Sequence, residues 1–422
     1  MRILYIHQYF ATRESTSGTR SYEFARRLVE KGFQVSVLTG GNTGEKLLGR
    51  PVENVEETTV DGIRIIIVGV RYDRTASPPK KALSFLRFMW RAAKVALKEN
   101  TDLVFATSTP LTVAFPALAK KIFQRTPYVF EVRDLWPEVP IRIGILRNPI
   151  IIGLARWLEK KAYKHASHIV ALSEGMRDGI IARSIPAEKV TVIPNCADLD
   201  LFGPQAPPDP QLAARLRGKF VCIHSGAMGR INGLDHVIDT AIWLKQYAAK
   251  EQATKEHAVN ERPTDDIAFL LIGVGSERPR LQERARSAGL DNVIFMDPVP
   301  KQQLPGVINA CQVCLMSVAP IPVLEMNSAN KFFDYLASAK PVIINYGGWM
   351  KNVLEDSGAG LSVAYDAEAL ATALMALKDD PERCAQMGAN ARKLAEREYD
   401  RALMVDRIEM VLRSALKSDA KS

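Results

Sequence analysis

The densest group of residues that could do chemistry is PIPVLEMNSANKFFDYLASAKPVI, residues 320–343. Asn330 and Lys331 begin a predicted helix, and Asp334 lies within its first turns. If Asn330 is the N-cap, the Lys331 ammonium stands at the helix end where its charge opposes the helix dipole. A cation at that unfavourable place suggests an anionic ligand. The alternative is a local ion pair between Lys331 and Asp334, which are three residues apart.

Two glycine turns could hold phosphate groups. In HSGAMGRINGLD, residues 224–235, a predicted strand is followed by a glycine turn, Arg230 and a helix. The guanidinium of an arginine at such a place offers a fixed fork of donors that suits a diphosphate. In TSGTR, residues 16–20, Gly18 lets a ligand approach the free N–H groups at the start of a helix. The alternative for this second turn is a Ser or Thr cap beside a flexible glycine.

Charged residues also end a predicted strand in EVRDLWPE, residues 131–138. Charges followed by Trp-Pro make a poor core, so we expect this segment to lie at the lip of a ligand site. The alternative is that Arg133 and Asp134 pair with each other at the surface.

These segments lie between alternating strand and helix patterns. Such repetition predicts an α/β fold with two doubly wound parallel sheets, in which ligands bind beyond the carboxyl ends of the strands. Two similar sheets in tandem also predict a cleft between them. The expected strands are residues 3–6, 34–38, 63–70, 103–106, 128–132, 168–171 and 190–193, then 220–224, 269–272, 293–296, 313–317, 342–345 and 361–363. The helices expected in the first half are residues 20–31, 82–98, 111–123 and 150–164.

The predicted division gives a first domain over residues 1–205 and a second over 206–399. The proline-rich stretch 194–219 is interpreted as a linker, and a last helix near 400–418 could cross back to the first domain. Residues 248–266 are polar and charged with little periodicity, which favours a solvated insertion.

Composition excludes several classes of protein. The apolar runs are far shorter than the roughly 20 residues that span a bilayer, and the N-terminus lacks the apolar core of a signal peptide. Five cysteines favour a reducing compartment, and we expect Cys311 and Cys314 to be packed rather than metal-bound. We therefore expect a cytoplasmic protein. An NAD oxidoreductase is disfavoured because Arg278 replaces the last glycine of a dinucleotide fingerprint that would start at Gly273, and a nucleic-acid-binding protein is disfavoured because no binding motif is present.

The excess positive charge is confined to the first half of the chain. Residues 1–205 carry 30 Lys and Arg against 20 Asp and Glu, whereas residues 206–422 carry 26 against 27. In the helix expected over 82–98, a basic stripe runs beside Trp90, which suits an anionic membrane surface; the alternative is an ordinary solvated helix face. The membrane-facing candidates are Arg87, Trp90, Arg91, Lys94 and Lys98, with Arg156, Trp157, Lys160 and Lys164 of the helix over 150–164 as an addition. Phe85, Met89 and Ala93 are expected to pack on the sheet.

Seven motifs in order resemble the retaining family 4 glycosyltransferases of the two-domain GT-B architecture. The motifs are HQYF with the glycine turn, VRDLWPE, VIPNCADLDLF, SGAMGRINGLD, LIGVGSERPRLQ, MDPVP and SANKFFDYLASAKPVI. Within that family, the sequence is most similar to bacterial O-antigen and capsule enzymes such as L-fucosamine transferases and colanic-acid-type transferases. The resemblance implies transfer of a sugar from a nucleotide-sugar, with a UDP-sugar and an N-acetylated amino sugar as the candidate donors. It also implies an acceptor saccharide on a polyprenyl diphosphate at the anionic inner face of the cytoplasmic membrane.

The resemblance also implies roles for individual residues. Gly18 and Arg230 are expected at the donor diphosphate, Glu325 at the donor sugar, Asp334 at the ribose, and residues 297–300 at the base. The implied donor-binding set is Gly18, Gly226, Arg230, Asn232, Gly273, Val299, Glu325, Asn330, Lys331 and Asp334. The implied catalytic set is Arg230, Lys331, Glu325, Arg133 and Asp134.

Three positions depart from the family pattern. Asp334 stands where Glu is usual, Asn232 stands where a second phosphate-binding lysine is usual, and Arg133 stands where many members have a histidine. Lys331 could replace the missing lysine, whereas Arg133 cannot act as a base at neutral pH because it stays protonated.

Transition-state charge can be stabilised by these cations alone, so we expect neither a cofactor nor a metal. The one DxD motif, Asp198 to Asp200, lies in the linker-like stretch and is not expected to bind metal. The main alternative function is a sugar-nucleotide epimerase or hydrolase with the same architecture.

Overall fold

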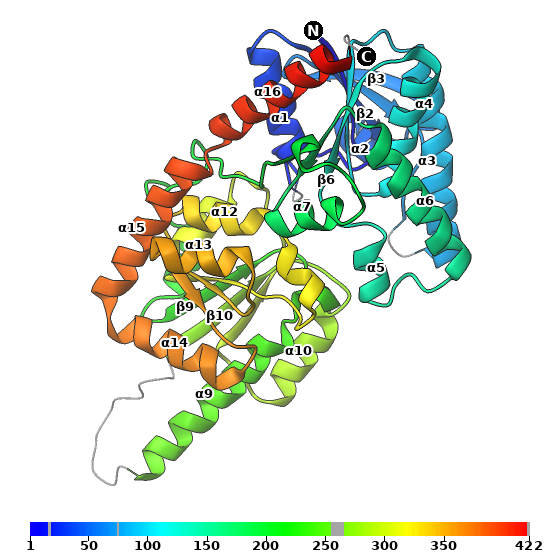
Figure 1. Cartoon of the computed structure of the whole chain (residues 1–422). Coiled ribbons are helices and arrows are strands. Elements are labelled where there is room, and N and C mark those ends of the chain that lie inside the picture. The colour runs from blue at the N-terminus through cyan, green and yellow to red at the C-terminus, as the bar shows by residue number, and fades with distance from the viewer. Residues whose placement is uncertain (16–17, 74–75, 255–265, 420–422) are drawn as a thin grey trace. The chain divides into compact units, whose positions relative to one another are not determined.

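The computed structural model describes residues 1–15, 18–73, 76–254 and 266–419, which form two compact units (Figure 1). Unit 1 comprises Met1–Pro194 together with Ala402–Ser422, and unit 2 comprises Asn195–Arg401. The boundary thus precedes the one expected at residue 205. The reason is that residues 195–219 do not form a free linker: they include a helix, and the Asn195 N–H donates to the Ser328 Oγ of unit 2 at 3.2 Å.

Unit 1 is built around a sheet of eight strands in the order β3-β4-β2-β1-β5-β6-β7-β8. Its strands are β1 (Arg2–Ile6), β2 (Gln34–Gly40), β3 (Val55–Val60), β4 (Ile63–Val68), β5 (Leu103–Thr107), β6 (Tyr128–Val132), β7 (His168–Ala171) and β8 (Val190–Val192). All neighbours are parallel except β3, which pairs antiparallel with β4. The sequence analysis missed β3 because it is an edge strand with no buried side chain and two adjacent glutamates.

The helices of unit 1 connect successive strands. They are α1 (Arg20–Glu30), α2 (Gly41–Leu48), α3 (Pro78–Lys98), α4 (Ala114–Gln124), α5 (Glu138–Arg142), α6 (Pro149–His165), α7 (Glu174–Ile181) and α16 (Arg401–Asp419), with short 3-10 turns at Leu111–Val113 and Ala187–Lys189. Helix α3 starts four residues earlier than expected, because prolines are well tolerated in a first helical turn. Its buried face differs from the predicted one in part, because Ala93 is buried as expected but the two larger predicted side chains are not. Phe88 is fully buried, whereas Phe85 and Met89 are only half-buried and Phe85 stacks on Tyr72.

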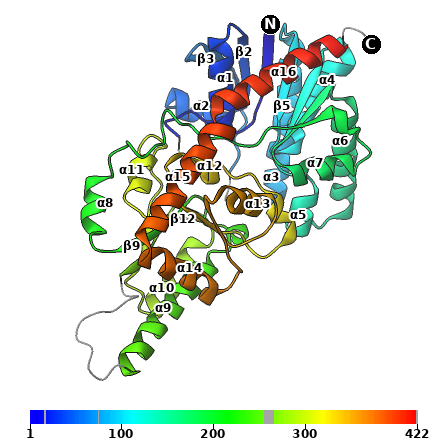
Figure 2. The same ribbon diagram turned by 60° about the vertical axis from the view of Figure 1, so that its left-hand side comes forward.

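Helix α16 packs beside α1, as the two views of the molecule show (Figures 1 and 2). Lys31, directly after α1, pairs with Asp406 at 2.7 Å and with Glu409 at 2.9 Å. The Arg413 guanidinium lies over the Phe33 ring at 4.8 Å. The last helix therefore belongs with the first unit of the chain.

Unit 2 contains a wholly parallel sheet in the order β11-β10-β9-β12-β13-β14. Its strands are β9 (Phe220–Ser225), β10 (Ile267–Ile272), β11 (Val293–Met296), β12 (Val313–Met316), β13 (Val342–Ile344) and β14 (Gly360–Ser362). Its helices are α8 (Pro210–Arg215), α9 (Asp235–Thr254), α10 (Arg278–Ser287), α11 (Leu304–Asn309), α12 (Asn330–Ala337), α13 (Trp349–Ser357), α14 (Ala367–Asp379) and α15 (Pro381–Glu398), with 3-10 turns at Arg230–Asn232 and Pro322–Met326. The predicted α/β fold with two doubly wound sheets is confirmed.

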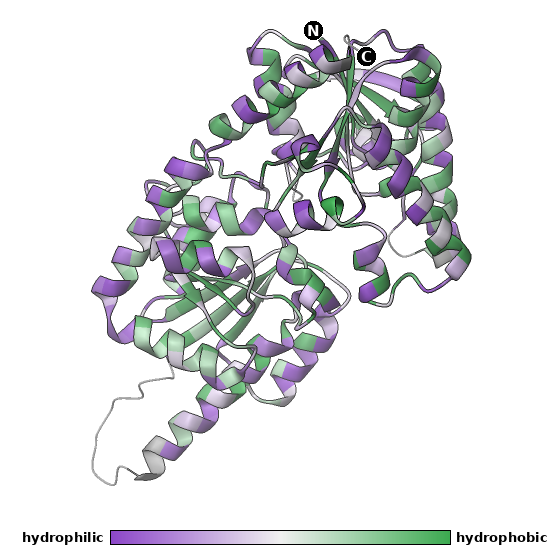
Figure 3. Ribbon diagram, viewed as in Figure 1, coloured by the Kyte–Doolittle hydropathy of each residue, from purple (hydrophilic) through white to green (hydrophobic). Residues whose placement is uncertain are grey.

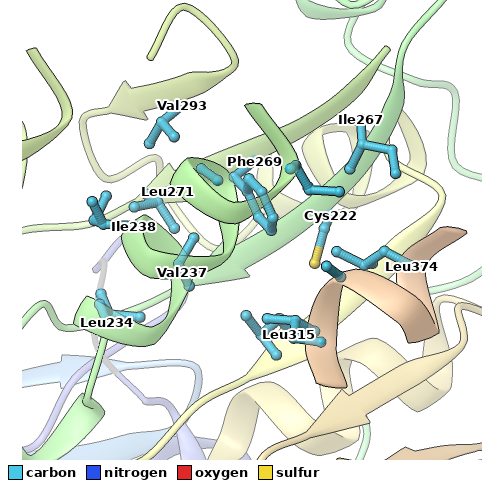
Figure 4. Close-up of a cluster of buried hydrophobic side chains, with 14 of the residues drawn as sticks. Cys222, Leu234, Val237, Ile238, Ile267, Phe269, Leu271, Val293, Leu315 and Leu374 are labelled. Carbon is cyan, nitrogen blue, oxygen red and sulfur yellow. The ribbon is translucent and has the colours of Figure 1, made fainter. Parts of the chain in front are cut away.

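The core of unit 2 fills the space between its sheet and two helices that contact each other, α9 and α14. Phe269 and Leu271 of β10 meet Val237 and Ile238 of α9 there, and Leu374 of α14 closes the cluster (Figure 4). The cysteines Cys311 and Cys314 are buried, as expected for packed thiols. Part of the predicted insertion is helical, because α9 continues to Thr254; residues 255–265 lie outside the described residues.

Candidate functional site

Two glycine turns meet at the carboxyl ends of β9 and β10. The Gly226 N–H donates to the Ile272 carbonyl at 2.8 Å, and the Gly273 N–H donates to the Met296 carbonyl at 3.1 Å, so the sheet ladder continues into both turns. Both glycines have positive φ, 137° and 146°, and a Cβ on Gly273 would lie 1.8 Å from the Gly226 carbonyl oxygen. Only glycine fits these turns, which leave exposed backbone at Gly226.

Lys331 lies beside this exposed backbone. A Cβ on Gly226 would come within 2.9 Å of the Lys331 Nζ, and the same Nζ lies 3.2 Å from the Nε2 of His224. Within the described residues, Lys331 has no carboxylate partner, so the predicted alternative of a pair with Asp334 is wrong. Burial lowers the pKa of Lys331 to about 7. The ammonium is thus held without a counter-charge, at the first turn of α12.

His224 is a functional candidate that the sequence analysis missed. The ring is fully buried, and its Nδ1 lies 3.2 Å from the Leu315 carbonyl, which can only accept a hydrogen bond. The proton therefore sits on Nδ1, and Nε2 accepts from Lys331. Burial lowers the pKa of His224, and the Lys331 charge lowers it further, so the ring is neutral. The available signal was a histidine at the last strand position before a glycine turn.

Helix α12 is anchored to the end of β9 by a second contact. The Ser225 N–H donates to the Tyr335 hydroxyl oxygen at 2.8 Å. The predicted N-cap is wrong, however, because Ala329 occupies the cap position and Asn330 is the first helical residue. The polar NSANK run misled the interpretation, since Asn is a favoured cap.

Arg230 is exposed and stands on a tight turn after Gly229. The Asn232 Oδ1 accepts from the Gly229 N–H at 3.1 Å, so Asn232 stabilises the turn that presents the arginine. A cavity of about 230 Å³ opens beside it, lined by Gly229, Arg230, Gly233, Leu234, Asp235, Glu277, Arg280 and Leu281. Arg280 is engaged with Asp235 and Glu277, whereas Arg230 has no carboxylate partner among the residues that the structure describes.

The two predicted acids of unit 2 lie in different surroundings. Glu325 is half-buried, and a Cβ on Gly347 would lie 3.2 Å from its Oε2. Asp334 is buried with its Oδ1 3.5 Å from the Lys301 Nζ, and burial raises the pKa of Asp334 to about 6. Its carboxylate thus faces Lys301 and not Lys331. The roles expected for the two acids at the donor sugar and the ribose stay predictions.

Asp198, the first acid of the DxD motif, is paired inside the protein. Its carboxylate accepts from Arg401 and from the Lys301 Nζ, the latter at 2.9 Å. Burial alone would raise the pKa of Asp198, but Arg401 and Lys301 lower it below the usual value. Two protein cations therefore already neutralise this carboxylate.

The turn after β11 is expected at the nucleotide base. Val299 is half-buried there. Asp297 pairs with Arg278, whose guanidinium also donates to the Gly273 carbonyl at 3.1 Å. This contact links the turn to the glycine pair, and the base-binding role stays a prediction.

In unit 1, polar residues gather where β1, β5 and β6 end. The Arg133 N–H donates to the Ser108 Oγ at 3.0 Å, and the Thr109 hydroxyl donates to the Asp134 carboxylate at 3.3 Å. Burial raises the pKa of Asp134. No Arg133–Asp134 ion pair is present in the described part of the chain, so the predicted surface pair is wrong.

His7, which the sequence analysis did not select, is buried nearby. Burial lowers the pKa of His7, and the Arg133 charge lowers it further.

Glu131 was expected at the edge of a ligand site, and this prediction is wrong. It is fully buried and paired with Arg20, also fully buried, with an Nη2 to Oε1 distance of 2.9 Å. Gly18 is exposed, and Thr19 caps α1 without a side-chain hydrogen bond; Thr16 and Ser17 of the predicted phosphate turn lie outside the described residues.

Not every residue of the predicted membrane-facing stripe of α3 is available to bind lipid. Arg87, Lys94 and Lys98 are exposed, and Trp90 is 57% exposed. Arg91 is different, because its Nη1 donates to the Glu53 carbonyl at 3.1 Å and to the Gly69 carbonyl at 2.9 Å. One of the four predicted lipid-binding cations is therefore engaged within the protein.

Comparison with known proteins identifies the family. Residues 15–196 match the family model described as a glycosyl transferase 4-like domain, and residues 229–380 match the model of glycosyl transferases group 1. The alpha-maltose-1-phosphate synthase of Mycolicibacterium smegmatis is 23% identical over 296 residues, covering 65% of this chain and 69% of that protein. Escherichia coli WcaI, named as a colanic acid biosynthesis glycosyl transferase, is 22% identical over 292 residues, covering 67% of this chain and 66% of that protein.

A solved structure shares the fold over nearly the full length. Anabaena Alr3699/HepE in complex with UDP-glucose aligns with a TM-score of 0.69 at 18% identity, covering 98% of this chain and 100% of that chain. The two family models together cover most of the sequence, and the chain belongs to the group 1, family 4 glycosyltransferases with the GT-B fold.

Proposed function

We propose that the protein transfers a sugar, with retention of configuration, from a UDP-sugar to a saccharide carried on a polyprenyl diphosphate. The observation that supports this most directly is the Lys331 ammonium, which is partly buried without a carboxylate partner among the described residues and lies against the open backbone of Gly226. A diphosphate placed there would supply the missing negative charge. The exposed guanidinium of Arg230, which follows the Gly226 turn in the sequence, would add a second donor.

The mechanism follows from where charge develops. Breaking the bond between sugar and phosphate leaves a nucleoside diphosphate with growing negative charge, and donors that are already in place stabilise that state more than the ground state. Lys331 is held in place by His224, and Arg230 by the turn that Asn232 closes. Both cations belong to the protein, so this step needs no divalent ion.

The acceptor is inferred from the basic first unit and from one relative. WcaI is named for colanic acid biosynthesis, which supports a role in a bacterial surface polysaccharide such as O-antigen or capsule. Within residues 1–15, 18–73, 76–254 and 266–419, no helix is long and apolar enough to cross a membrane. We propose peripheral attachment to the anionic inner face of the cytoplasmic membrane, which would bring the protein to its lipid-linked acceptor.

Replacing Arg230 with alanine is expected to lower kcat about 100-fold, the low end for loss of one oxyanion donor, because this arginine is exposed to water. Radiolabelled sugar transfer from a UDP-sugar is the measurement. Arg286→Ala is the matched control, since Arg286 is an exposed arginine of the same unit that pairs with Glu283 and does not line the cavity. Near-normal turnover in Arg230→Ala would show that Arg230 does not stabilise the leaving diphosphate.

Chelation by EDTA is expected to leave turnover unchanged, since Lys331 and Arg230 carry the leaving-group charge in this proposal. The assay compares initial rates with and without EDTA and after readdition of Mg²⁺ or Mn²⁺. A loss with EDTA that either ion restores would contradict the proposal.

A sugar-nucleotide epimerase or hydrolase is the second candidate, because the same donor site would serve it. Thermal-shift screening of UDP-, GDP- and dTDP-sugars identifies the donor through the stabilisation that a bound ligand gives. Incubating that donor without acceptor then separates the two activities: rapid loss of donor favours the hydrolase or epimerase, and dependence on a polyprenyl-linked saccharide favours the transferase.

A further inference from the structure

Helix α6 carries an exposed apolar ridge on its first half. Ile150 is 73% exposed, Leu154 is 63% exposed and Trp157 is 56% exposed, with Ile151 exposed beside them. Their spacing of four and three residues places these side chains on one face of the helix. The first turns of α6 carry hydrophobic colour in Figure 3, although the helix lies on the surface. Large apolar groups clustered in water usually mark an interaction surface.

The adjacent helices extend this apolar surface. Helix α4 contacts both α3 and α6, and the three lie side by side in Figure 1. On α3, Leu83, Leu86 and Trp90 are exposed, and the Trp90 ring packs edge-on against Phe115 of α4 at 4.9 Å. The apolar surface thus spans a layer of three helices.

The charge on these three helices is almost entirely positive. Their single acidic residue is Glu159, which is buried and lies 3.4 Å from Arg183. The exposed cations are Lys80, Arg87, Lys94, Lys98, Arg156, Lys160, Lys161 and Lys164. A second copy of this face would repel the first, whereas an anionic surface complements it.

The position of the ridge relates it to the polar residues of unit 1. Strands β6 and β7 are parallel neighbours, so α6, which connects them, runs back along the sheet. Its first turn therefore lies at the edge where the strands end. The side chains of His7 and Arg133 follow strands that end at this same edge. A lipid surface that meets the ridge would be close to these groups.

We propose that the first half of α6 inserts its apolar ridge into the boundary between headgroups and acyl chains of an anionic bilayer. The lysines of its second half then lie over lipid phosphates. This inference rests on the peripheral membrane attachment proposed above. It makes α6 the main inserting element, because the basic stripe of α3 has one of its cations, Arg91, engaged within the protein.

The test is flotation with vesicles of phosphatidylglycerol and phosphatidylcholine. The double variant Ile150→Ser/Leu154→Ser is expected to bind at least about tenfold more weakly, because the inserted apolar area is lost. Leu403→Ser/Met410→Ser on α16 is the matched control: these side chains are also exposed and apolar in unit 1, but they lie beside Asp406 and Glu409. The tryptophan emission of the protein should shift to the blue on binding, and Trp157→Phe should remove most of that shift.

Three results would overturn the proposal. They are unchanged binding by the double variant, an equal loss in the α16 control, or a stable dimer of the unaltered protein that the double variant dissolves. Thermal unfolding and stabilisation by UDP are measured in every variant. Normal values show that the variants are folded, and a donor site that fails to bind UDP would contradict the proposed function without affecting the flotation result.

Discussion

Replacing Lys331 with alanine is expected to lower kcat about 1,000-fold, the upper end for loss of one preorganised donor. The effect should exceed that of Arg230→Ala, because Lys331 is less exposed than Arg230 and a charge interaction is stronger where water is excluded. The ammonium is also fixed before the donor arrives, by the Nε2 of a neutral His224. Transfer of labelled sugar under saturating donor gives kcat, and a rise in KM with an unchanged kcat would contradict the assignment.

The same residue gives a pH dependence for donor binding. With a pKa of about 7 in the free protein, Lys331 loses its charge as the pH rises, whereas a bound diphosphate favours the charged form. Affinity for UDP should therefore fall between pH 7 and 9, by up to about tenfold per unit. The Lys331→Ala variant should lack this slope. Lys351→Ala, an exposed lysine paired with Glu355 on α13, should keep both the slope and the turnover.

Glu131→Gln is expected to destabilise unit 1 by about 3–5 kcal/mol, because it removes the carboxylate charge that pairs with the buried Arg20 guanidinium. The carbonyl groups of Ile193 and Pro194 also accept from Arg20, but they carry no net charge. Hydrogen exchange read by mass spectrometry reports the loss as lower protection of β5 and β6. Strands β9 and β10 of unit 2 serve as an internal reference and should keep their protection.

Two further variants make this result specific. Arg20→Met/Glu131→Leu removes both charges and should recover most of the lost stability, since an apolar pair of similar volume avoids the cost of a buried charge. Glu56→Gln removes an exposed pair with Arg50 and should change protection little. Equal protection from exchange in Glu131→Gln and in the unaltered protein would show that the buried ion pair contributes nothing to the stability of unit 1.

The sequence predicts the parallel strands because they are runs of apolar residues buried on both faces, such as Ile65–Ile67 within β4. It does not predict β3, since an edge strand made mostly of glutamate and threonine has the composition of a loop. The buried side of α3 was predicted only in part, with Ala93 buried as expected, because apolar residues lie almost all around this helix. Only packing against the sheet selects Phe88 over Phe85.

The sequence could select single residues of the candidate site but not the contacts that position them. Lys331 and Arg230 could be selected because a cation at a helix start or after a glycine turn is unusual. The contact that positions Lys331 could not be found, because His224 lies 107 residues away in the sequence and only the pairing of β9 with β12 orients its ring. Glu131 was misassigned for the same reason: its partner Arg20 is 111 residues distant.

The contact between Ala197 and Asp400 bears on how such a protein could be assembled. These residues pair in a short parallel bridge, so the points where the chain enters and leaves unit 2 are neighbours. Unit 2 is therefore an uninterrupted segment with adjoining ends, inserted into a unit whose own sequence is discontinuous. A gene exchange at this single seam would replace unit 2 in one step and leave the remainder of the polypeptide intact.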